Sequence, residues 1–194
     1  MPKKFIYKIN NIENFNCILN SSRCIATGKN GLRCKKRSII GFEYCCIHLL
    51  LVKHLKIKPS LIPNSGNGLF VVDKQRQPND IIFRPNDLIC DYNGELINNI
   101  TKQARYANHN SPYAVQISNN NIIDCACKRG VGSVINTNPG HNNAKFSVYF
   151  FQNHNPKAKI KASKNIRNNS EIYLAYGNAF NLNDGSSHIT KNCR

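Results

Sequence analysis

The sequence predicts a mostly β protein of several small sheets with few short helices, preceded by a small cysteine-rich module. Between residues 60 and 177 the apolar residues fall in short runs divided by Gly, Pro and Asn, as in domains built from short strands. One stretch of that region, residues 98–108, has a helical pattern, and four of the nine cysteines lie within residues 21–50. With 194 residues the chain is long enough for one medium domain and an appendage.

The expected elements follow one another without an internal repeat. Residues 1–20 are polar and Asn-rich, and we expect them to be weakly structured. Residues 49–57, LLLVKHLKI, predict a connecting helix or strand that ends at Pro59. The expected strands are LIP, LFVV, IIF, LICDY, YAVQI, NIID, AKFSVYFF, AKIKAS and EIYLAY, and residues 178–194 form a polar tail.

The last apolar run, EIYLAYG, places a tyrosine directly before a glycine. Ile172, Leu174 and Tyr176 alternate with Tyr173 and Ala175, which predicts a buried strand. Its final hydroxyl either satisfies the core or points into an active site.

The formal charge of +17 indicates an affinity for polyanions such as nucleic acid or chromatin. The abundance of Lys, Asn and Ile is also what AT-rich codons would produce, and both explanations stay open. No apolar stretch approaches the roughly 18 residues that span a membrane, and the start of the chain lacks the apolar region of a signal peptide. We therefore expect a soluble intracellular protein, for which metal binding is a better explanation of the cysteines than disulfides.

Four residues of the cysteine-rich stretch have the spacing of a metal site. Cys24, Cys34, Cys45 and His48 form the pattern C-x9-C-x10-C-x2-H, and three thiolates with one imidazole suit a tetrahedral structural Zn²⁺. Cys46 could replace Cys45, although C-x-H is a tighter chelate. A segment this short cannot bury enough core to fold alone, so the metal would supply its folding energy.

The spacing and the flanking residues resemble the WRC-type zinc motif, with Leu32 where that motif has its Trp. The resemblance implies contact with nucleic acid or a protein partner. The charge for such contact would come from Lys29, Arg33, Lys35, Lys36 and Arg37.

A second set of short motifs runs through the rest of the chain in a fixed order. The motifs are Gly66-Asn67-Gly68, Tyr92-x-Gly94-Glu95, Ile123-Asp124, Asn136-Thr137-Asn138, Asn143-Ala144 and Glu171 through Tyr176-Gly177. Together they resemble the SET domain, the fold of protein-lysine methyltransferases, over residues 60–177. That resemblance implies several small sheets with a knot-like threading of the C-terminal segment.

The resemblance also implies the roles of individual residues. S-adenosyl-L-methionine would be held by Gly66, Asn67 and Gly68 at its methionine part and by Asn136 and Thr137 at its amino group and adenine. Tyr176 would point its hydroxyl at the transferring methyl group. Tyr92 and Tyr113 would line the lysine channel, with Tyr113 also near the cofactor. The catalytic set is therefore Tyr176, Tyr92 and Tyr113, and Glu171 would fix local structure.

Two departures from the family pattern are visible. Asn136-Thr137-Asn138 replaces Asn-His-Ser, with Ser133-Val134 in place of Arg-Phe, and the cluster of three cysteines that usually follows the domain is missing. The lid over the channel must then come from the tail, through Phe180, or from a partner subunit in a homodimer. Leu174 stands where the family often has Phe or Tyr, which would permit more than one methyl transfer.

The resulting prediction has four segments: a polar N-terminal segment (1–20), a WRC-like zinc module (21–55), a SET domain (56–177) and a tail (178–194). The expected substrate is a histone or another chromatin protein with an accessible lysine, and the basic surface would contact DNA or nucleosomes. The small size and the composition resemble SET proteins of large DNA viruses or AT-rich protists, which predicts a nucleus, viral factory or virion as the location. The alternative is a non-catalytic chromatin or nucleic-acid binding module on the same scaffold.

Overall fold

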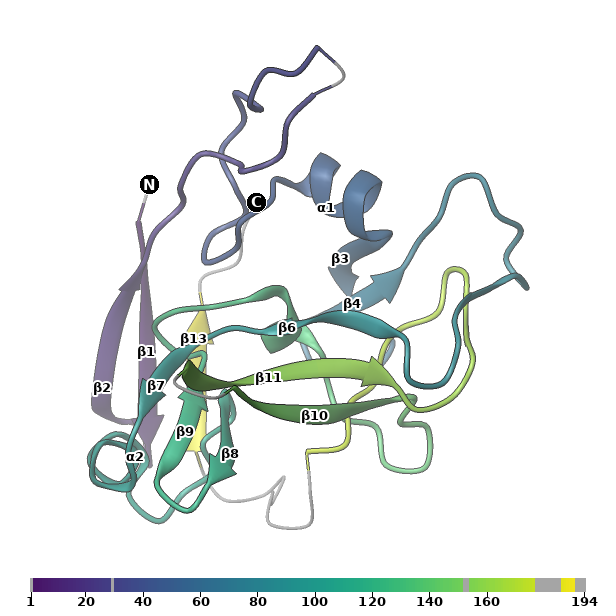
Figure 1. Cartoon of the computed structure of the whole chain (residues 1–194). Coiled ribbons are helices and arrows are strands. Elements are labelled where there is room, and N and C mark those ends of the chain that lie inside the picture. Colours follow the sequence, from purple (N-terminus) through teal and green to yellow (C-terminus); the bar gives the residue numbers. More distant parts are fainter. Residues whose placement is uncertain (1, 29, 152–153, 177–185, 191–194) are drawn as a thin grey trace.

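The computed structural model describes residues 2–28, 30–151, 154–176 and 186–190, and it is mostly β, with 40% strand and 12% helix (Figure 1). Five small sheets of two or three strands make up the fold, as the sequence predicts. They are ordered β13-β1-β2, β10-β11-β6, β12-β5, β3-β4 and β7-β9-β8.

The N-terminal segment forms a hairpin, so the prediction of weak structure for residues 1–20 is wrong. β1 (Lys3–Ile9) pairs antiparallel with β2 (Ile12–Leu19) and, along its other edge, with β13 (Ser186–Thr190). Asn10 and Asn11 both have positive φ, the backbone of the two-residue turns that favour Asn. Phe5 and Tyr7 alternate with less buried residues along β1 and are completely buried. The alternation covers few residues, and the many polar residues on either side made it hard to recognise in the sequence.

A disulfide between Cys17 and Cys127 ties the hairpin to the central domain across 110 residues. The sequence favoured metal binding over disulfides, and for this pair that expectation is wrong. The hairpin brings Cys17 beside the loop that follows β9 (Asn121–Asp124), a contact that no local pattern reveals.

The connecting stretch is both a helix and a strand. α1 (Cys46–Lys53) leads into β3 (Leu55–Pro59), which pairs with β4 (Asn67–Val71), and Leu49 of α1 is buried in the main core. Pro59 ends the strand as expected. The loop of residues 21–45 projects from this end of the molecule, above the sheets in Figure 1.

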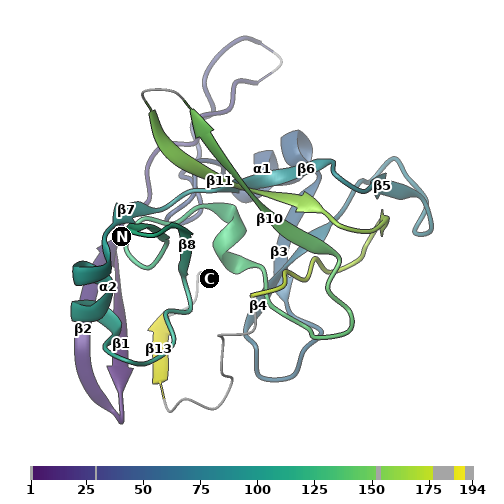
Figure 2. The same ribbon diagram turned by 60° about the horizontal axis from the view of Figure 1, so that its bottom comes forward.

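The expected central helix is α2 (Asn99–Tyr106), capped by the Asn98 side chain, which accepts a hydrogen bond from the Thr101 N–H at 2.8 Å. α2 lies against the sheet of β7 (Glu95–Ile97), β9 and β8 (Ala114–Ser118) (Figures 1 and 2). Both helices have eight residues, and no helix among the described residues is long and apolar enough to cross a membrane.

The middle of the molecule is the sheet of β10 (Ala144–Phe151), β11 (His154–Ala162) and β6 (Leu88–Tyr92). A 3-10 helix, η1 (Val131–Val134), lies against β6. Gly132 allows this contact, because a Cβ there would lie 3.2 Å from the Asp91 oxygen and the Tyr92 ring of β6, and 2.7 Å from the Ile160 side chain of β11. The remaining strands, β5 (Ile81–Phe83) and β12 (Ile166–Arg167), pair with each other at the edge.

In the closing segment, residues 171–176, Ile172 and Leu174 are buried as predicted, but Tyr176 is half-buried and Ala175 is exposed, and the segment is no regular strand. It makes isolated bridges, from Glu171 to Phe70, from Tyr173 to Asn136 and from Leu174 to Ala144. The segment thereby reaches three separate parts of the chain instead of extending one sheet. Gly177 and Phe180 lie outside the described residues, as does most of the tail.

Candidate active site and metal cluster

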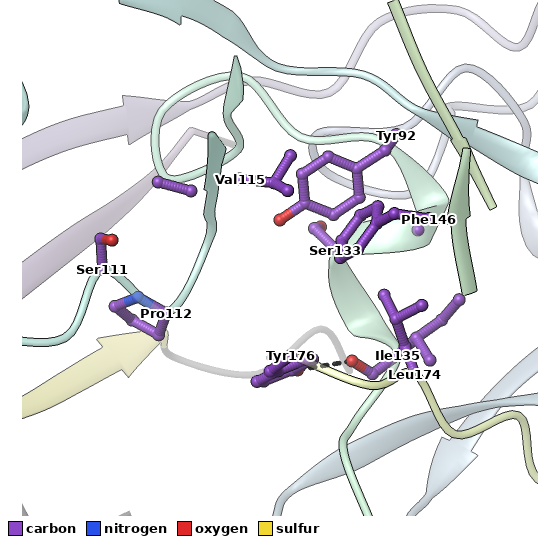
Figure 3. Close-up of a pocket in the computed structure, with 11 residues that line it drawn as sticks. Tyr92, Ser111, Pro112, Val115, Ser133, Ile135, Phe146, Leu174 and Tyr176 are labelled. Atoms are coloured by element: carbon purple, nitrogen blue, oxygen red, sulfur yellow. Dashed lines mark hydrogen bonds between the residues drawn. The ribbon is translucent and has the colours of Figure 1, made fainter. Parts of the chain in front are cut away.

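A pocket opens between β6, η1, β10, the closing segment and the chain that leads into β8 (Figure 3). Two tyrosines face it, Tyr92 from the end of β6 and Tyr176 from the end of the closing segment. Its other lining residues are Ser111, Pro112, Ala114, Val115, Gly132, Ser133, Ile135, Phe146 and Leu174. Among the described residues, the pocket lining contains no Asp, Glu, His, Lys or Arg, so this lining suits an apolar or neutral group.

The hydroxyls of both pocket tyrosines are held by backbone carbonyls. Tyr176 donates to the Ile135 oxygen at 2.6 Å (Figure 3), and Tyr92 donates to the Tyr113 oxygen at 2.7 Å. Burial raises the pKa of Tyr176, with a smaller contribution from Tyr113, and burial likewise raises the pKa of Tyr92. Both groups are therefore neutral phenols at physiological pH, and they act as oriented dipoles.

Tyr113 differs from the prediction that its ring lines the lysine channel. Its ring is not among the residues lining the pocket; it contacts Phe5 edge-on at 5.6 Å between centroids and lies 4.3 Å from the Arg129 guanidinium. The backbone carbonyl of Tyr113 is the part that supports the site, since it orients the Tyr92 hydroxyl. The N-terminal hairpin supplies Phe5, a neighbour of this ring that the sequence motif does not indicate.

The segments expected to hold the cofactor are joined by hydrogen bonds. The Asn136 amide donates to the Asn67 oxygen at 3.1 Å, and the Asn136 oxygen accepts from the Leu174 N–H at 2.9 Å. Because Ile135 binds Tyr176 and Asn136 binds Asn67, the glycine motif, the Asn-Thr-Asn segment and the pocket form one continuous structure. Thr137 follows Asn136 in that segment and is half-buried.

The two glycines of the motif have different reasons to be glycine. Gly66 has a φ of +68°, and a Cβ there would meet nothing within 4 Å, so its backbone borders open space. Gly68 is buried, and a Cβ there would collide with the Glu171 carboxylate. The open backbone at Gly66 therefore lies beside a compact hydrogen-bonded loop, which leaves room for a ligand to approach the main chain.

Glu171 is buried and accepts hydrogen bonds from several segments, a larger structural role than the sequence predicted. Its carboxylate accepts from the Ser60 hydroxyl and the Leu61 N–H, both at 2.7 Å, and from the Tyr173 hydroxyl at 3.0 Å. The Asn136 amide also approaches it, at 3.4 Å. Glu171 therefore fixes the loop before β4 to the Asn136 segment, and with it the glycine motif.

A second buried carboxylate holds the wall that carries Tyr113. Asp124 accepts from Arg105 at 2.6 Å, from the Tyr106 hydroxyl at 2.9 Å and from the Ala126 N–H at 2.9 Å. Arg105 also pairs with Glu95 at 2.7 Å. The motif residues Glu95 and Asp124 thus clamp α2 onto its sheet and do not face the pocket.

Several lining residues carried no signal in the sequence. Phe146 packs edge-on against Tyr92 with 5.1 Å between ring centroids, and Ser133 stands in the pocket with its hydroxyl donating to the Gly130 oxygen at 2.8 Å. The alternation of Ala144, Phe146 and Val148 along β10 indicates that they share a face, but not what that face covers.

The four predicted metal ligands lie close together in space, and they come from a part of the sequence that does not line the pocket. One ligand atom from each of Cys24, Cys34, Cys45 and His48 lies within 4.8 Å of all the others. The His48 Nδ1 is 3.6 Å from the Cys24 sulfur and 3.4 Å from the Cys45 sulfur. Tetrahedral Zn²⁺ with bonds of about 2.1–2.3 Å has ligand–ligand edges of about 3.6 Å, so the four residues fit the ion.

Backbone hydrogen bonds reach two of the cluster sulfurs. The Cys45 N–H donates to the Cys24 sulfur at 3.3 Å and the Lys36 N–H to the Cys34 sulfur at 3.4 Å. Burial opposes ionisation of Cys24, but hydrogen bonds from the Cys45 and Ala26 backbone lower its pKa overall, whereas burial raises the pKa of Cys45. Cys46 is exposed and lies outside the cluster, which decides the choice that the sequence left open.

The loop of residues 21–45, which we call the zinc loop after the ion that its cluster fits, binds its own arginines. Arg23 donates to the Cys34 and Arg33 oxygens, and Arg33 donates in return to the Cys24 and Arg23 oxygens, all at 2.8–2.9 Å. Arg37 donates to the Ser21 oxygen at 2.9 Å. Among the charges expected to contact a partner, Lys35 and Lys36 remain exposed, and Lys29 lies outside the described residues.

Comparison with known proteins agrees with this geometry. The pocket and fold define a domain of the SET class, and the family profile of the SET domain matches residues 81–177, half of the 194-residue chain. The chain belongs to the SET domain family. No curated protein matches it in sequence.

Two solved structures have a similar fold. One is described as ctPRC2 in an autoinhibited conformation bound to S-adenosylmethionine, with 21% identity and a TM-score of 0.52 over 66% of this chain. The other is a humanized mutant of the Chaetomium thermophilum Polycomb Repressive Complex 2 bound to the inhibitor GSK126, with 23% identity, a TM-score of 0.52 and the same 66% coverage. The match takes in 16% and 15% of those chains, and at this identity it shows the fold alone.

Proposed function

We propose that this protein transfers a methyl group from S-adenosylmethionine to the side-chain amine of a protein lysine. The observation that carries the proposal is the Tyr176 hydroxyl, held in an uncharged pocket and linked through Ile135 and Asn136 to the glycine motif. A methyl donor and an amine acceptor would meet where these two parts join.

The pocket chemistry favours a lysine amine in its reactive form. The amine of a lysine in water has a pKa of about 10.4, so holding it neutral at pH 7 costs about 4.6 kcal/mol. The walls of Val115, Ile135, Phe146 and Leu174 disfavour the charged ammonium, and the lining residues that the structure describes include no carboxylate that would stabilise it. The aliphatic stem of lysine matches the apolar walls, and the proton leaves to solvent before the amine is enclosed.

The chain's own residues would mainly bind and orient. Gly66, Asn67 and Gly68 would hold the methionine part of the cofactor, and Asn136 and Thr137 its amino group and adenine. S-adenosylmethionine, when bound, supplies an electrophilic methyl group on a sulfonium. The neutral hydroxyl of Tyr176 would direct its dipole at that positive charge, and Tyr92 would shape the lysine channel.

We extend the proposal to the setting of the activity. The substrate would be a histone or another chromatin protein in a nuclear or viral-factory setting, acted on by a small viral-type SET protein able to form a homodimer. Residues 56–177 would form the SET domain and residues 21–55 a module stabilised by structural Zn²⁺. The Cys₃His geometry supports the last point.

The test is incubation of the full chain with S-adenosylmethionine labelled on the methyl group and a mixture of core histones. We expect label on one or more histones, at lysine by mass spectrometry, and none with Tyr176→Phe over the same period. Tight cofactor binding without label on any histone would instead favour a non-catalytic binding module on this scaffold.

A further inference from the structure

The outward face of the β10–β11 hairpin carries a row of lysines that the proposed function does not use. Along β11 the residues Ala158, Ile160 and Ala162 are buried, so Lys157, Lys159 and Lys161 alternate onto the opposite face. Lys157 is exposed, and the other two are half-buried.

The neighbouring strand continues this basic face. In the antiparallel register, Lys145 lies opposite Lys161, Ser147 opposite Lys159 and Tyr149 opposite Lys157. The amines of Lys159 and Lys161 lie 5.1 and 5.2 Å from the Tyr149 ring centroid, so the ring orders two of the lysines. We call Lys145, Lys157, Lys159 and Lys161 the lysine face.

The lysine face is short of counter-charge. On β6 the exposed Asp91 is opposite Lys159, and it is the acid that the strand register places beside the four lysines. Within the part of the chain that the structure describes, none of the four amines forms an ion pair. Like charges on adjacent strands repel one another, and a polyanion lying across them would relieve that repulsion.

We propose that the lysine face binds the phosphate backbone of duplex DNA. From Lys157 to Lys161 the strand advances four residues, about 13 Å, which is the axial rise of about four nucleotides on one strand of a duplex. Three amines in line with Lys145 beside them match a regular row of phosphates. Lysine contacts of this kind give affinity without reading base sequence.

This surface lies on the other side of the strand from the pocket. Phe146 lines the pocket, while its neighbours Lys145 and Ser147 point the opposite way. Bound DNA would therefore sit against the outside of the pocket wall and leave the pocket open. The zinc loop is a weaker candidate for the same partner, since its arginines are bound to backbone oxygens.

Two variants of the full chain that remove the same charge test the assignment. Lys157→Gln, Lys159→Gln and Lys161→Gln together remove the β11 row, whereas Lys35→Gln, Lys36→Gln and Lys74→Gln remove three exposed lysines elsewhere. Binding of a fluorescent 30-base-pair duplex, an arbitrary length of about three helical turns, is measured by anisotropy over a range of KCl concentrations.

We expect the magnitude of the slope of log K against log salt concentration to be smaller by about 2 to 3 in the β11 variant, because each phosphate contact contributes about 0.9 to that slope. The control variant should lose less than about 1. Equal losses in the two variants, or an unchanged slope in the β11 variant, would overturn the proposal.

Two further measurements keep the test decisive. If the triple variant does not fold, the exposed Lys157→Gln alone should lower the slope by about 1, and no change would count against the lysine face. Polyglutamate of equal charge should displace the duplex poorly from wild-type protein. Equally good displacement would mean that the face fits an acidic polypeptide and would overturn the assignment to DNA.

Discussion

The pocket and the cysteine–histidine cluster are stabilised in opposite ways. The pocket is enclosed by β6, η1, β10 and the closing segment, all packed on one continuous core. The buried apolar residues of the zinc loop are Cys24, Ala26 and Cys45, two of which belong to the candidate metal cluster. The first region keeps its shape through burial of apolar surface, whereas the second depends on its ligands.

The two regions meet at α1. His48 faces the cluster from the first turn of this helix, and Leu49, the next residue, is buried in the main core. The core therefore positions one metal ligand in advance, and the other three arrive on a loop. This difference predicts that damage to the cluster stays local.

The largest effect should come from removing the metal. A strong chelator, or Cys34→Ser, should unfold residues 21–45, because structural Zn²⁺ sites supply about 10–16 kcal/mol of apparent binding free energy. Amide hydrogen exchange should rise there and stay low in β6, β10 and β11. Cys46→Ser is the control, since that exposed thiol lies outside the cluster. Protection lost throughout the central sheet would mean that the two regions are one folding unit.

The pocket side has its own cross-link, the Cys17–Cys127 disulfide. It closes a loop of about 110 residues, for which chain entropy predicts a stabilisation of about 4–5 kcal/mol. Reduction, or Cys17→Ser, should lower the free energy of unfolding by an amount of this order, measured by denaturant titration. Cys46→Ser should leave the free energy of unfolding unchanged. If Cys17→Ser also left it at the wild-type value, the hairpin would stay docked through Phe5 and Tyr7 alone.

Loss of the Tyr176 hydroxyl should separate catalysis from packing. Tyr176→Phe keeps the ring and should retain most of the cofactor affinity, but methyl transfer should fall about 100- to 1,000-fold, or about 2.7–4 kcal/mol. The measurements are calorimetry for the cofactor and transfer at saturating cofactor. Tyr44→Phe, which removes a hydroxyl beside the cluster, should transfer at the wild-type rate. Transfer by Tyr176→Phe within a few-fold of wild type would leave Tyr176 a core residue.

Substitution of Glu171 tests whether the glycine motif and the Asn136 segment depend on this buried carboxylate for their shape. In Glu171→Gln an amide NH₂ group replaces one carboxylate oxygen and faces the Ser60 hydroxyl or the Leu61 N–H, which are both donors. An unpaired buried donor costs about 1–3 kcal/mol. Cofactor affinity should fall about tenfold, with the transfer rate at saturation less affected. Glu13→Gln, an exposed carboxylate, is the matched control. Equal affinity in both variants would show that the loops hold their shape without Glu171.

The smallest effect is spectroscopic and concerns pH. Burial raises the pKa of Tyr92 and Tyr176, so the neutral phenols stabilise the fold up to about pH 10 and that contribution is lost as pH rises toward their folded-state pKa. Hydrogen bonding to Lys161 lowers the pKa of the exposed Tyr149. In an absorbance titration Tyr149→Phe should remove the earliest phenolate signal, and Tyr176→Phe should preserve it. An early signal that survives in Tyr149→Phe would place the low-pKa phenol elsewhere.

The sequence by itself determined the parts of this protein that depend on short spacings. The short apolar runs predicted the small sheets, the pattern around residues 98–108 predicted α2, and the C-x9-C-x10-C-x2-H spacing predicted a cluster that the structure assembles. Each of these is decided by neighbours along the chain, because side-chain periodicity and chelate spacing act over a few residues.

Tertiary structure alone decided which side chains meet across long distances in the sequence. The pairing of Cys17 with Cys127, the turn of the Tyr113 ring toward Phe5 and the bonds of Glu171 to Ser60 and Leu61 all join segments about 110 residues apart. The closing segment follows the same rule, since its isolated bridges depend on three separate partners. Such contacts arise from packing of the whole core, and packing depends on shapes that no local pattern of residues encodes.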